Sequence, residues 1–558
     1  MKKRFLKYSA GFVTAFLLLF SSCNDMDLAP TDKFTEGNYW TSSEKATMVL
    51  NMAYSQMNNN DYFFKTEALS DNLYEGRGSS AEKAISSGQA DASNGRFHDE
   101  WKSCYEGIKT CHIFLANVDL IPDMDENLKA RMKAEARFIR AYLYFRLTNW
   151  YGDVPLFDHD LTLSESKTIS RTPQAEVLAF VHSELDAVLE VLPTKEEYSE
   201  ADRGRITSGA VAALKARIYL YNNDWANVVT WCEKLINTAD YGQYTLFPSY
   251  EGIFLPENEY NSEVILDISY VPSLRTWGNY YDYAPLSIGA RVNALAPTQE
   301  LVNDYIMLNG KTINSAGSGF SETTPYKNRD PRLTATVVYH EYQWKKPDGT
   351  FQTIYIQPGT APNEVALVDE YKGQGTNSTS TGYYLRKYYN PTALASFTSG
   401  LNLILIRYAD VLLMYAEAKN ELEQMDQNIW TKTISVLRKR AGFTDPEALD
   451  YNAAWSKSDL QDLIRRERRS ESAVEGLRIY DLRRWKTAEV TLNGYPHGAK
   501  YGDPATDNGY IRLDKRSFNK DRDYLWAVPQ SEKDINPTLG QNGCTTKFLN
   551  NRKKAIHL

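Results

Sequence analysis

Apolar and polar residues recur with helical spacing over residues 126–156. Neither proline nor glycine occurs there before Gly152, so the pattern predicts a single helix of roughly five or six turns. Its apolar positions form two stripes, one made of alanines, that cover about half of its circumference or more. So wide an apolar arc favours a helix inside a stacked array, although a central helix of another all-α domain would show the same period. The remaining face carries Lys129, Lys133, Arg137 and Arg140.

Further helical patterns follow. Thr172 and Pro173 predict the start of a helix, with the threonine as N-cap and the proline at the first helical position. An alanine-rich helix is expected at residues 210–221, and Asp224 and Trp225 open the next one. Two helices joined by so short a turn are typical of a tetratricopeptide-type pair at the level of the fold, although the strict repeat spacing is absent.

The pattern changes between residues 241 and 400. Helical periodicity fades, Gly, Pro, Asn, Thr and Tyr become frequent, and short β-like runs occur at residues 263–268 and 334–342. A loop-rich region of this length is usually functional. We therefore predict a mainly α protein: tetratricopeptide-like stacked helical pairs form a scaffold, and a long loop-rich region contains short β-strands.

Helical patterns return towards the C-terminus, where arginine and glutamate alternate over residues 467–484. Such alternation could mark an anion site, but we interpret it as salt-bridged helix faces.

The N-terminus has the order of a bacterial signal peptide. Four positive charges at residues 2–7 precede an apolar run at residues 10–20, which is too short to span a bilayer permanently. Ser21 and Ser22 then precede Cys23. Removal of residues 1–22 takes four positive charges from a formal net charge of −8 and leaves −12. A chain this acidic is a poor candidate for binding nucleic acid.

The sequence contains few signs of catalytic or metal chemistry. No CxxC pair occurs, and Cys104 and Cys111 lie about 10 Å apart along a predicted helix, too far for a disulfide, so we expect buried free thiols. The seven histidines form no H-x-H or H-E-x-x-H motif, and G-x-S-x-G is absent. We predict no catalytic residue, no metal site and no cofactor, although a glycosidase-like carboxylate pair stays open.

Several motifs together resemble the SusD/RagB family of outer-membrane nutrient-uptake lipoproteins from Bacteroidota. The run AEARFIRAY at residues 134–142, followed by YGDVPL at 151–156, resembles the family's signature helix and turn. His112 departs from the family's customary asparagine, and the chain continues to Leu558 beyond a QN-containing turn. Further similar segments are WKSCYEGI at 101–108, PTQELVNDY at 297–305, RYADVLLMYAEA at 407–418 and DLRRW at 481–485.

The resemblance implies a cell-surface protein anchored in the outer membrane. Residues 20–23 resemble a lipobox, with Phe20 where leucine is usual, so Cys23 is expected to carry the lipid after loss of the signal peptide at residues 1–22. An acidic segment follows and resembles an export signal to the outer leaflet. Residues 23–240 would form an N-terminal helical part, and residues 241–558 a loop-rich and C-terminal helical part of the same compact unit.

The function implied is non-catalytic capture of oligosaccharide or polysaccharide, followed by delivery to a SusC-like TonB-dependent transporter. The stacked helices of residues 126–236 and 405–485 would offer the transporter a rigid surface. Two alternatives stay open. A relative with the same scaffold could bind peptide, or the protein could be a surface glycoside hydrolase.

The resemblance also suggests where a ligand would lie. Tyrosine is frequent, with 38 residues against an equal share of ~28, and flat amphipathic rings suit sugar binding. The alternative is that these rings pack the long loop onto the helices. By region, the family pattern suggests the ligand-binding residues Asp71, Asn72, Tyr74, Arg77, Trp277, Tyr280, Tyr281 and Tyr283.

Overall fold

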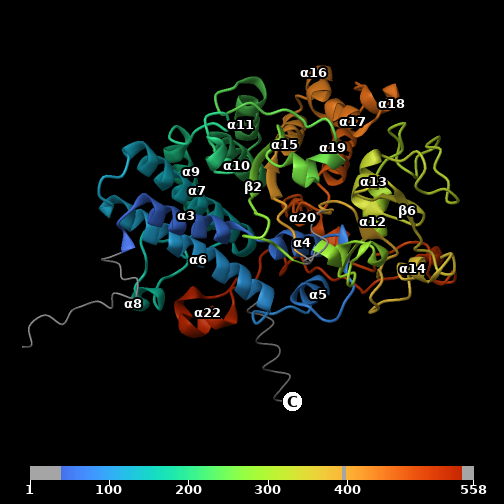
Figure 1. Cartoon of the computed structure of the whole chain (residues 1–558), viewed down its shortest axis with the longest axis horizontal. Helices are drawn as coiled ribbons and strands as arrows, with labels where there is room; N and C mark the ends of the chain where they lie inside the picture. The colour runs from blue at the N-terminus through green and yellow to red at the C-terminus, as the bar shows by residue number, and fades with distance from the viewer. Residues whose placement is uncertain (1–38, 279, 392–397, 543–558) are drawn as a thin grey trace, which may run out of the picture.

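The computed structural model of this 558-residue chain describes residues 39–278, 280–391 and 398–542. Helices dominate these residues and strands are few and short, which confirms the mainly α prediction. Figure 1 shows the N-terminal helices stacked at the left and a loop-rich part at the right. Among the helices of the described ranges, none combines the length and hydropathy that crossing a membrane requires. The predicted signal peptide and Cys23 lie outside the described residues.

The N-terminal part is built mainly of helices. They are α3 (Ser43–Met57), α4 (Asn60–Ala68), α5 (Ala81–Ser86), α6 (Gly95–Asn117), α7 (Glu126–Tyr151), α8 (Leu163–Ser166), α9 (Gln174–Leu189), α10 (Ser208–Tyr221) and α11 (Trp225–Asn237). The later helices are α12 (Gln299–Asp304), α13 (Pro331–Thr336), α14 (Glu364–Leu367), α15 (Tyr408–Glu421), α16 (Gln427–Trp430), α17 (Val436–Ala441), α18 (Pro446–Leu449), α19 (Lys457–Glu471), α20 (Arg478–Arg484), α21 (Ala488–Thr491) and α22 (Gln530–Ile535).

Helix α7 forms where the sequence pattern predicts it. The Asp125 carboxylate accepts a hydrogen bond from the Leu128 amide (2.8 Å) and caps the N-terminus. Gly152 ends the helix with φ of +70°, a conformation that favours glycine. The basic face is not solvated as a whole, because Arg140 is buried against Glu184 of α9, which also pairs with Arg137. These ion pairs join α7 to its neighbour.

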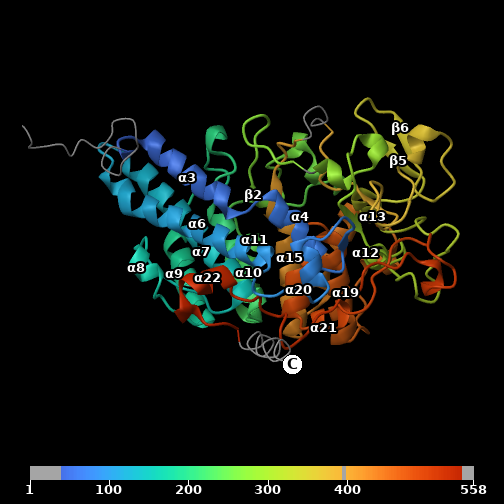
Figure 2. The ribbon, with the colours of Figure 1, turned by 90° about the horizontal axis from the view of Figure 1, so that it is seen from below.

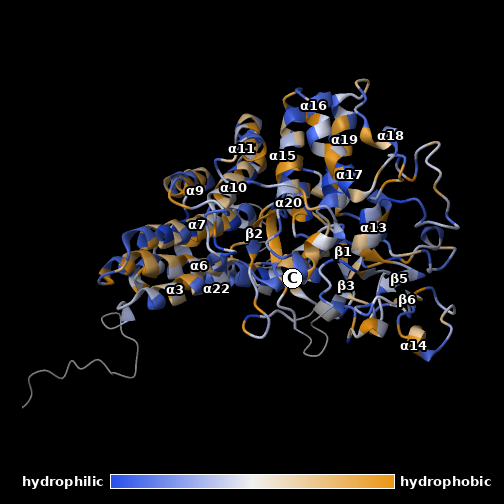
Figure 3. Cartoon of the chain, turned by 45° about the horizontal axis from the view of Figure 1, so that its top comes forward, coloured by the Kyte–Doolittle hydropathy of each residue, from blue (hydrophilic) through white to orange (hydrophobic). Residues whose placement is uncertain are grey.

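The helices form one continuous stack. Successive members of the series α3, α6, α7, α9, α10, α11, α15 and α19 pack against each other, and Figure 2 shows the same series from below. Figure 3 shows apolar and polar residues interleaved along these helices, as expected for elements with several packed neighbours. The pair α10 and α11 confirms the predicted two-helix unit, with Asp224 as N-cap of α11. Cys104, Cys111 and Cys232 are buried free thiols.

The strands form two-stranded antiparallel sheets, β1–β3, β2–β8, β4–β7 and β5–β6. Their bounds are β1 (Leu73–Glu75), β2 (Val264–Ile268), β3 (Leu295–Pro297), β4 (Val337–Val338), β5 (Tyr342–Lys345), β6 (Phe351–Ile354), β7 (Tyr384–Leu385) and β8 (Leu403–Arg407). Strands therefore tie the loop-rich region together and join it to the helices.

Two local predictions were wrong. Residues 334–336 are helical rather than extended, because the Asp330 carboxylate caps α13 through the Arg332 amide (2.9 Å). Helix α9 has Pro173, not Thr172, at its N-cap, since the Thr172 backbone is engaged in a β-bridge with Val154.

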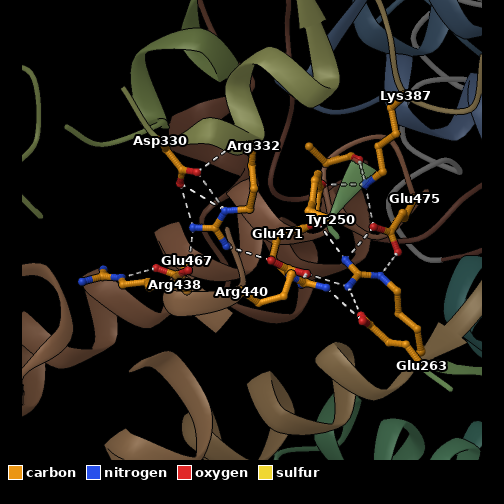
Figure 4. A network of polar contacts seen from close by, with 12 residues as sticks. Tyr250, Glu263, Asp330, Arg332, Lys387, Arg438, Arg440, Glu467, Glu471 and Glu475 are labelled. Atoms are coloured by element: carbon orange, nitrogen blue, oxygen red, sulfur yellow. Dashed lines mark hydrogen bonds and ion pairs between the residues drawn. The ribbon is translucent and has the colours of Figure 1, made fainter. Parts of the chain in front are cut away.

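The alternating arginines and glutamates of the C-terminal part form ion pairs inside the protein. Figure 4 shows this buried network, in which Arg407 of β8 contacts Glu263 (2.7 Å), Glu471 (2.6 Å) and Glu475 (2.8 Å). Arg332 of α13 contacts the second oxygen of Glu471 (2.8 Å). The predicted salt bridges are thus present, but they hold α13, β8 and α19 together in the core. This rigid centre supports the loops described next.

Candidate functional site

Two segments that are predicted from the sequence to contact a ligand lie next to each other beside the β1–β3 sheet. Just beyond β1, the amide of Gly76 donates to the carbonyl of Ala294 (3.2 Å). The amide of Ala294 in turn donates to the carbonyl of Asp282 (2.6 Å). The loop at residues 76–80 and the 3-10 helix η5 (Tyr280–Tyr283) are therefore neighbours, although they are far apart in the sequence.

A cluster of charged and amide groups surrounds this junction. The guanidinium of Arg77 donates to the side-chain oxygen of Asn377 (2.8 Å). The guanidinium of Arg291 donates to both carboxylate oxygens of Asp282, each at 3.1 Å. Burial raises the pKa of Asp282, and Arg291 and Arg77 oppose that rise. Asn377 and Arg291 are exposed and Arg77 is half-buried, so the cluster faces solvent.

A cavity of about 450 Å³ opens on the other side of the same loop. The hydroxyl of Tyr74 donates to the Asp514 carboxylate (2.7 Å), and the Lys83 ammonium lies 2.9 Å from the same carboxylate. Ser80 donates to the carboxylate of Glu75 (2.5 Å). We call this cavity, together with Arg77, Asp282, Arg291 and Asn377, the loop face. The volume of the cavity lies within the range of small-molecule pockets, roughly 300–1,000 Å³.

The pKa values of two carboxylates in the cavity are shifted in opposite directions. Burial raises the pKa of Glu75. Burial would also raise the pKa of Asp514, but hydrogen bonds from Tyr74 and Lys83 outweigh it and lower that pKa. Opposed pKa shifts also occur at glycosidase sites, so the possibility of hydrolysis calls for a direct measurement. Among the described residues, no group of three or more His, Cys, Asp or Glu side chains is arranged to hold a metal ion.

Comparison with known families identifies the group to which the chain belongs. Residues 262–544, about half of the chain, match the model of the SusD family. This protein belongs to the SusD family. Residues 24–220 match a second model, described as starch-binding associating with outer membrane. The two matches agree with the resemblance drawn from the sequence motifs.

Individual relatives are similar over nearly the whole chain. SusD-like protein P2 of Formosa agariphila is 24% identical over 552 residues, which cover 96% of this chain and 99% of that protein. Among solved structures, a SusD-like carbohydrate-binding protein of Bacteroides fragilis superposes with a TM-score of 0.79 at 28% identity. That match covers 90% of this chain and all of the other. A second SusD-like protein of the same species gives a TM-score of 0.75 at 27% identity, covering 92% and 99%.

Two of the residues predicted for ligand binding lie inside this SusD-family protein instead. Asp71 is 6% exposed and accepts hydrogen bonds from the Arg478 guanidinium (2.8 and 3.1 Å). Burial alone would raise its pKa, but Arg469 and Arg478 outweigh burial and hold the pKa well below its usual value. Asn72 is 1% exposed and accepts from Arg469 (2.8 Å). Through these contacts both residues attach β1 to the C-terminal helices α19 and α20.

Tyr74 and Arg77 have different surroundings. Tyr74 is only 5% exposed, and the Lys83 ammonium lies 5.4 Å from the centre of its ring. Its ring therefore forms part of the cavity wall rather than an open stacking surface. Arg77 is half-buried, with its guanidinium at the polar cluster. Among the predicted residues whose side chains the structure describes, it is the most exposed.

Two rings of the aromatic cluster after β2 point inwards. Trp277 is 2% exposed, its indole donates to the Leu401 carbonyl (2.7 Å), and its ring lies 5.3 Å from that of Phe64. Tyr283 is 7% exposed and also packs on Phe64 (5.0 Å). The expected exposed platform is thus corrected for these two rings, because they fill the space over α4. The side chains of Tyr280 and Tyr281 lie outside the part of the chain that the structure describes.

The sequence patterns did not indicate the remaining polar groups of the loop face. Asn377 and Arg291 come from loops that carry no family motif, and Asp514 follows a stretch left without an interpretation. One signal is present in the sequence, because Gly373 and Gly375 lie just before Asn377. A polar residue beside a tight glycine turn is a common position for ligand contacts.

Proposed function

We propose that this SusD-family protein binds glycan at the loop face and passes it to a SusC-like TonB-dependent transporter in the outer membrane. Two matches to known proteins support the ligand class. A family model described as starch-binding covers residues 24–220, and one of the similar structures is a carbohydrate-binding protein. Binding without turnover is the activity that we expect.

The observation that carries the proposal is the polar cluster beside the cavity. Arg77, Arg291 and Asn377 offer donors and acceptors at the surface, within reach of a chain molecule lying across the loop. Sugar hydroxyls both donate and accept hydrogen bonds, so mixed guanidinium, amide and carboxylate groups suit them. Because most of the predicted aromatic rings are buried, we expect hydrogen bonds rather than ring stacking to dominate at this face.

Affinity electrophoresis of the whole chain through gels containing starch, laminarin, xylan, mannan or pectin tests this proposal. At least one polysaccharide should retard the wild type. Arg77→Ala should weaken that retardation about tenfold, since a hydrogen bond to a charged group contributes roughly 1.5–3 kcal/mol and ~1.4 kcal/mol is a factor of ten. Arg466→Ala is the matched control, because Arg466 is also half-buried and forms an ion pair with Asp304, at 3.7 Å.

The same samples separate the alternatives. Release of reducing ends from a retarded polysaccharide would identify a hydrolase, and Glu75→Gln would then be expected to abolish it. Binding of casein peptides in place of every polysaccharide would favour the peptide-binding alternative. Equal retardation of Arg77→Ala and wild type would remove the loop face from the proposal.

Delivery to a transporter requires a partner, because a tethered binding protein without a pore cannot import its ligand. We expect a β-barrel transporter to copurify with this protein from native membranes in mild detergent. The stacked helices of residues 126–236 and 405–485 remain our proposal for the contact surface. Recovery of the protein from such membranes only as a free monomer would contradict this part of the proposal.

A further inference from the structure

A second polar cavity lies in a different part of the fold. It has a volume of about 360 Å³ and opens between strand β2 and the loop that joins α9 to α10. None of its lining residues belongs to the loop face. Its lining includes Lys195, Tyr198, Gly204, Tyr260 and Asp267.

The wall of this cavity requires unusual backbone conformations. Gly204 has φ of +89°, and a Cβ there would lie 2.7 Å from Cε1 of Tyr260 and 2.8 Å from the hydroxyl of Ser269. Tyr260 itself has φ of +58°, in the left-handed region that bulky residues rarely adopt. Backbone strain of this kind is found preferentially at functional sites. Here the Tyr260 ring lies against Gly204, where only a residue without a Cβ fits.

Polar groups of both kinds line the cavity. Asp267 is 7% exposed and accepts hydrogen bonds from Ser269 (3.1 Å) and Asn402 (3.0 Å). Burial raises the pKa of Asp267 to about 7, so near neutral pH this group can accept or donate a proton in a hydrogen bond. Lys195 is half-buried, with its ammonium 4.9 Å from the Tyr244 ring centre, and burial lowers its pKa.

Two tyrosine rings add flat apolar surface. Tyr198 and Tyr260 are both half-buried and both line the cavity. The Tyr198 hydroxyl donates to the Ile206 carbonyl (2.9 Å), which fixes the ring, and Arg131 lies 5.4 Å from its centre. Arg205 also lines the cavity and is paired with Asp202 (2.8 Å). The charged residues of the lining are balanced in number, with Lys195, Arg203 and Arg205 against Glu196, Glu200 and Asp267. Rings, balanced charge and mixed hydrogen-bonding groups suit an uncharged ligand rich in hydroxyls.

We propose that this cavity is a second carbohydrate subsite, which holds one or two sugar units independently of the loop face. Its volume is near the lower end of the range for small-molecule pockets, which limits the ligand to this size. The inference rests on the proposed function, because the loop face supplies the glycan that a second subsite would share.

Saturation-transfer NMR of the whole chain with glucose, galactose, mannose, xylose, N-acetylglucosamine and glucuronic acid provides the test. At least one neutral sugar should bind to the wild type and to Arg77→Ala alike. Tyr260→Asn should weaken that binding at least tenfold, and asparagine tolerates the left-handed backbone at this position. Asp267→Asn, which keeps the side-chain volume, should weaken it as well, and thermal unfolding verifies that both variants fold.

The results distinguish this inference from the proposed function. If Arg77 alone controls retention by polysaccharide and no sugar of the panel binds, the second subsite is refuted while the loop face stands. Unchanged sugar binding by the two folded cavity variants would also refute it. If neither polysaccharide nor any sugar binds to the wild type, both proposals fail.

Discussion

Arg77 and Trp277 both belong to the predicted set of ligand-binding residues, but their surroundings in the structure differ. Arg77 reaches the exposed Asn377, whereas Trp277 is enclosed by Phe64 and by the backbone at Leu401. Arg77 can be removed without opening the core, because it is half-buried and its guanidinium contacts another surface group. A residue such as Trp277 cannot.

We predict that Trp277→Ala destabilises the protein, because a 2%-exposed indole and its hydrogen bond to the Leu401 carbonyl are lost. Removal of a buried tryptophan costs about 3–5 kcal/mol. Denaturant unfolding of wild type and variant measures this cost. Tyr495→Ala is a suitable control, since that ring is 46% exposed. A Trp277→Ala protein as stable as the control would contradict the burial described here.

The sequence could identify the segments of the candidate site but not the direction of their side chains. The Gly- and Tyr-rich loop around Trp277 has no period that distinguishes an inner from an outer face. Its partner Leu401 is 124 residues away, and Asn377 lies 300 residues from Arg77. Contacts over such separations depend on the assembled fold, so Asn377 could not be inferred. Arg291 lies nine residues from its partner Asp282, but no sequence motif marks it.

At the scale of elements, local patterns were sufficient for the helices. Helix α7 begins at its aspartate cap and ends at Gly152, both visible in the sequence. The short strands were harder, since residues 334–336 satisfy the strand pattern and yet form the end of α13. The ion pairs among the C-terminal helices were predicted from charge alternation. Their burial was not, because alternation of charge is the same on a solvated face.

We predict that Glu471→Gln weakens the packing of α13, β8 and α19. Burial would raise the pKa of Glu471, but Arg440, Arg407 and Arg332 outweigh burial and hold the pKa well below its usual value. Loss of this charge removes one of the carboxylates that compensate the buried Arg332, Arg407 and Arg440, at a cost of about 3–5 kcal/mol. Chemical denaturation at neutral pH measures the effect. Glu126→Gln, at an exposed residue of α7, is the control that should be neutral.

We predict a distinct pH dependence for Asp267→Asn. The pKa of Asp267 is raised to about 7, so the folded protein keeps a proton that the unfolded chain releases above its ordinary pKa of roughly 4. This group therefore makes the wild type less stable as pH rises from about 4 to 7, by up to about 1.4 kcal/mol per pH unit. The asparagine variant should gain stability relative to wild type between pH 5 and pH 8. If the difference in unfolding free energy between the variant and the wild type is the same at pH 5 and pH 8, this prediction is wrong.

At the scale of the whole molecule, the predicted signal peptide and Cys23 lie outside the described residues. We predict that Cys23 carries lipid, because basic, apolar and small residues precede it in the order of a lipoprotein signal. Metabolic labelling with an alkyne fatty acid should tag the wild type and not Cys23→Ala. Equal labelling of both would refute the anchor, whereas Cys232→Ala, which removes a buried thiol, should label like the wild type.

Several ion pairs join the two halves of the chain. In one of them, Asp410 of α15 pairs with Arg217 of α10 (2.6 Å), and Asp410 also pairs with Arg468 of α19 within the second half. Helix α11 also packs directly on α15. A break in the backbone between residues 240 and 241 would therefore leave the contacts between the two halves in place. We predict that residues 24–240 and 241–558, produced as separate fragments in one cell, assemble into a complex that copurifies and melts in a single transition. Asp410→Asn should weaken this fragment complementation, and two fragments that fold and elute apart would show that the halves are autonomous.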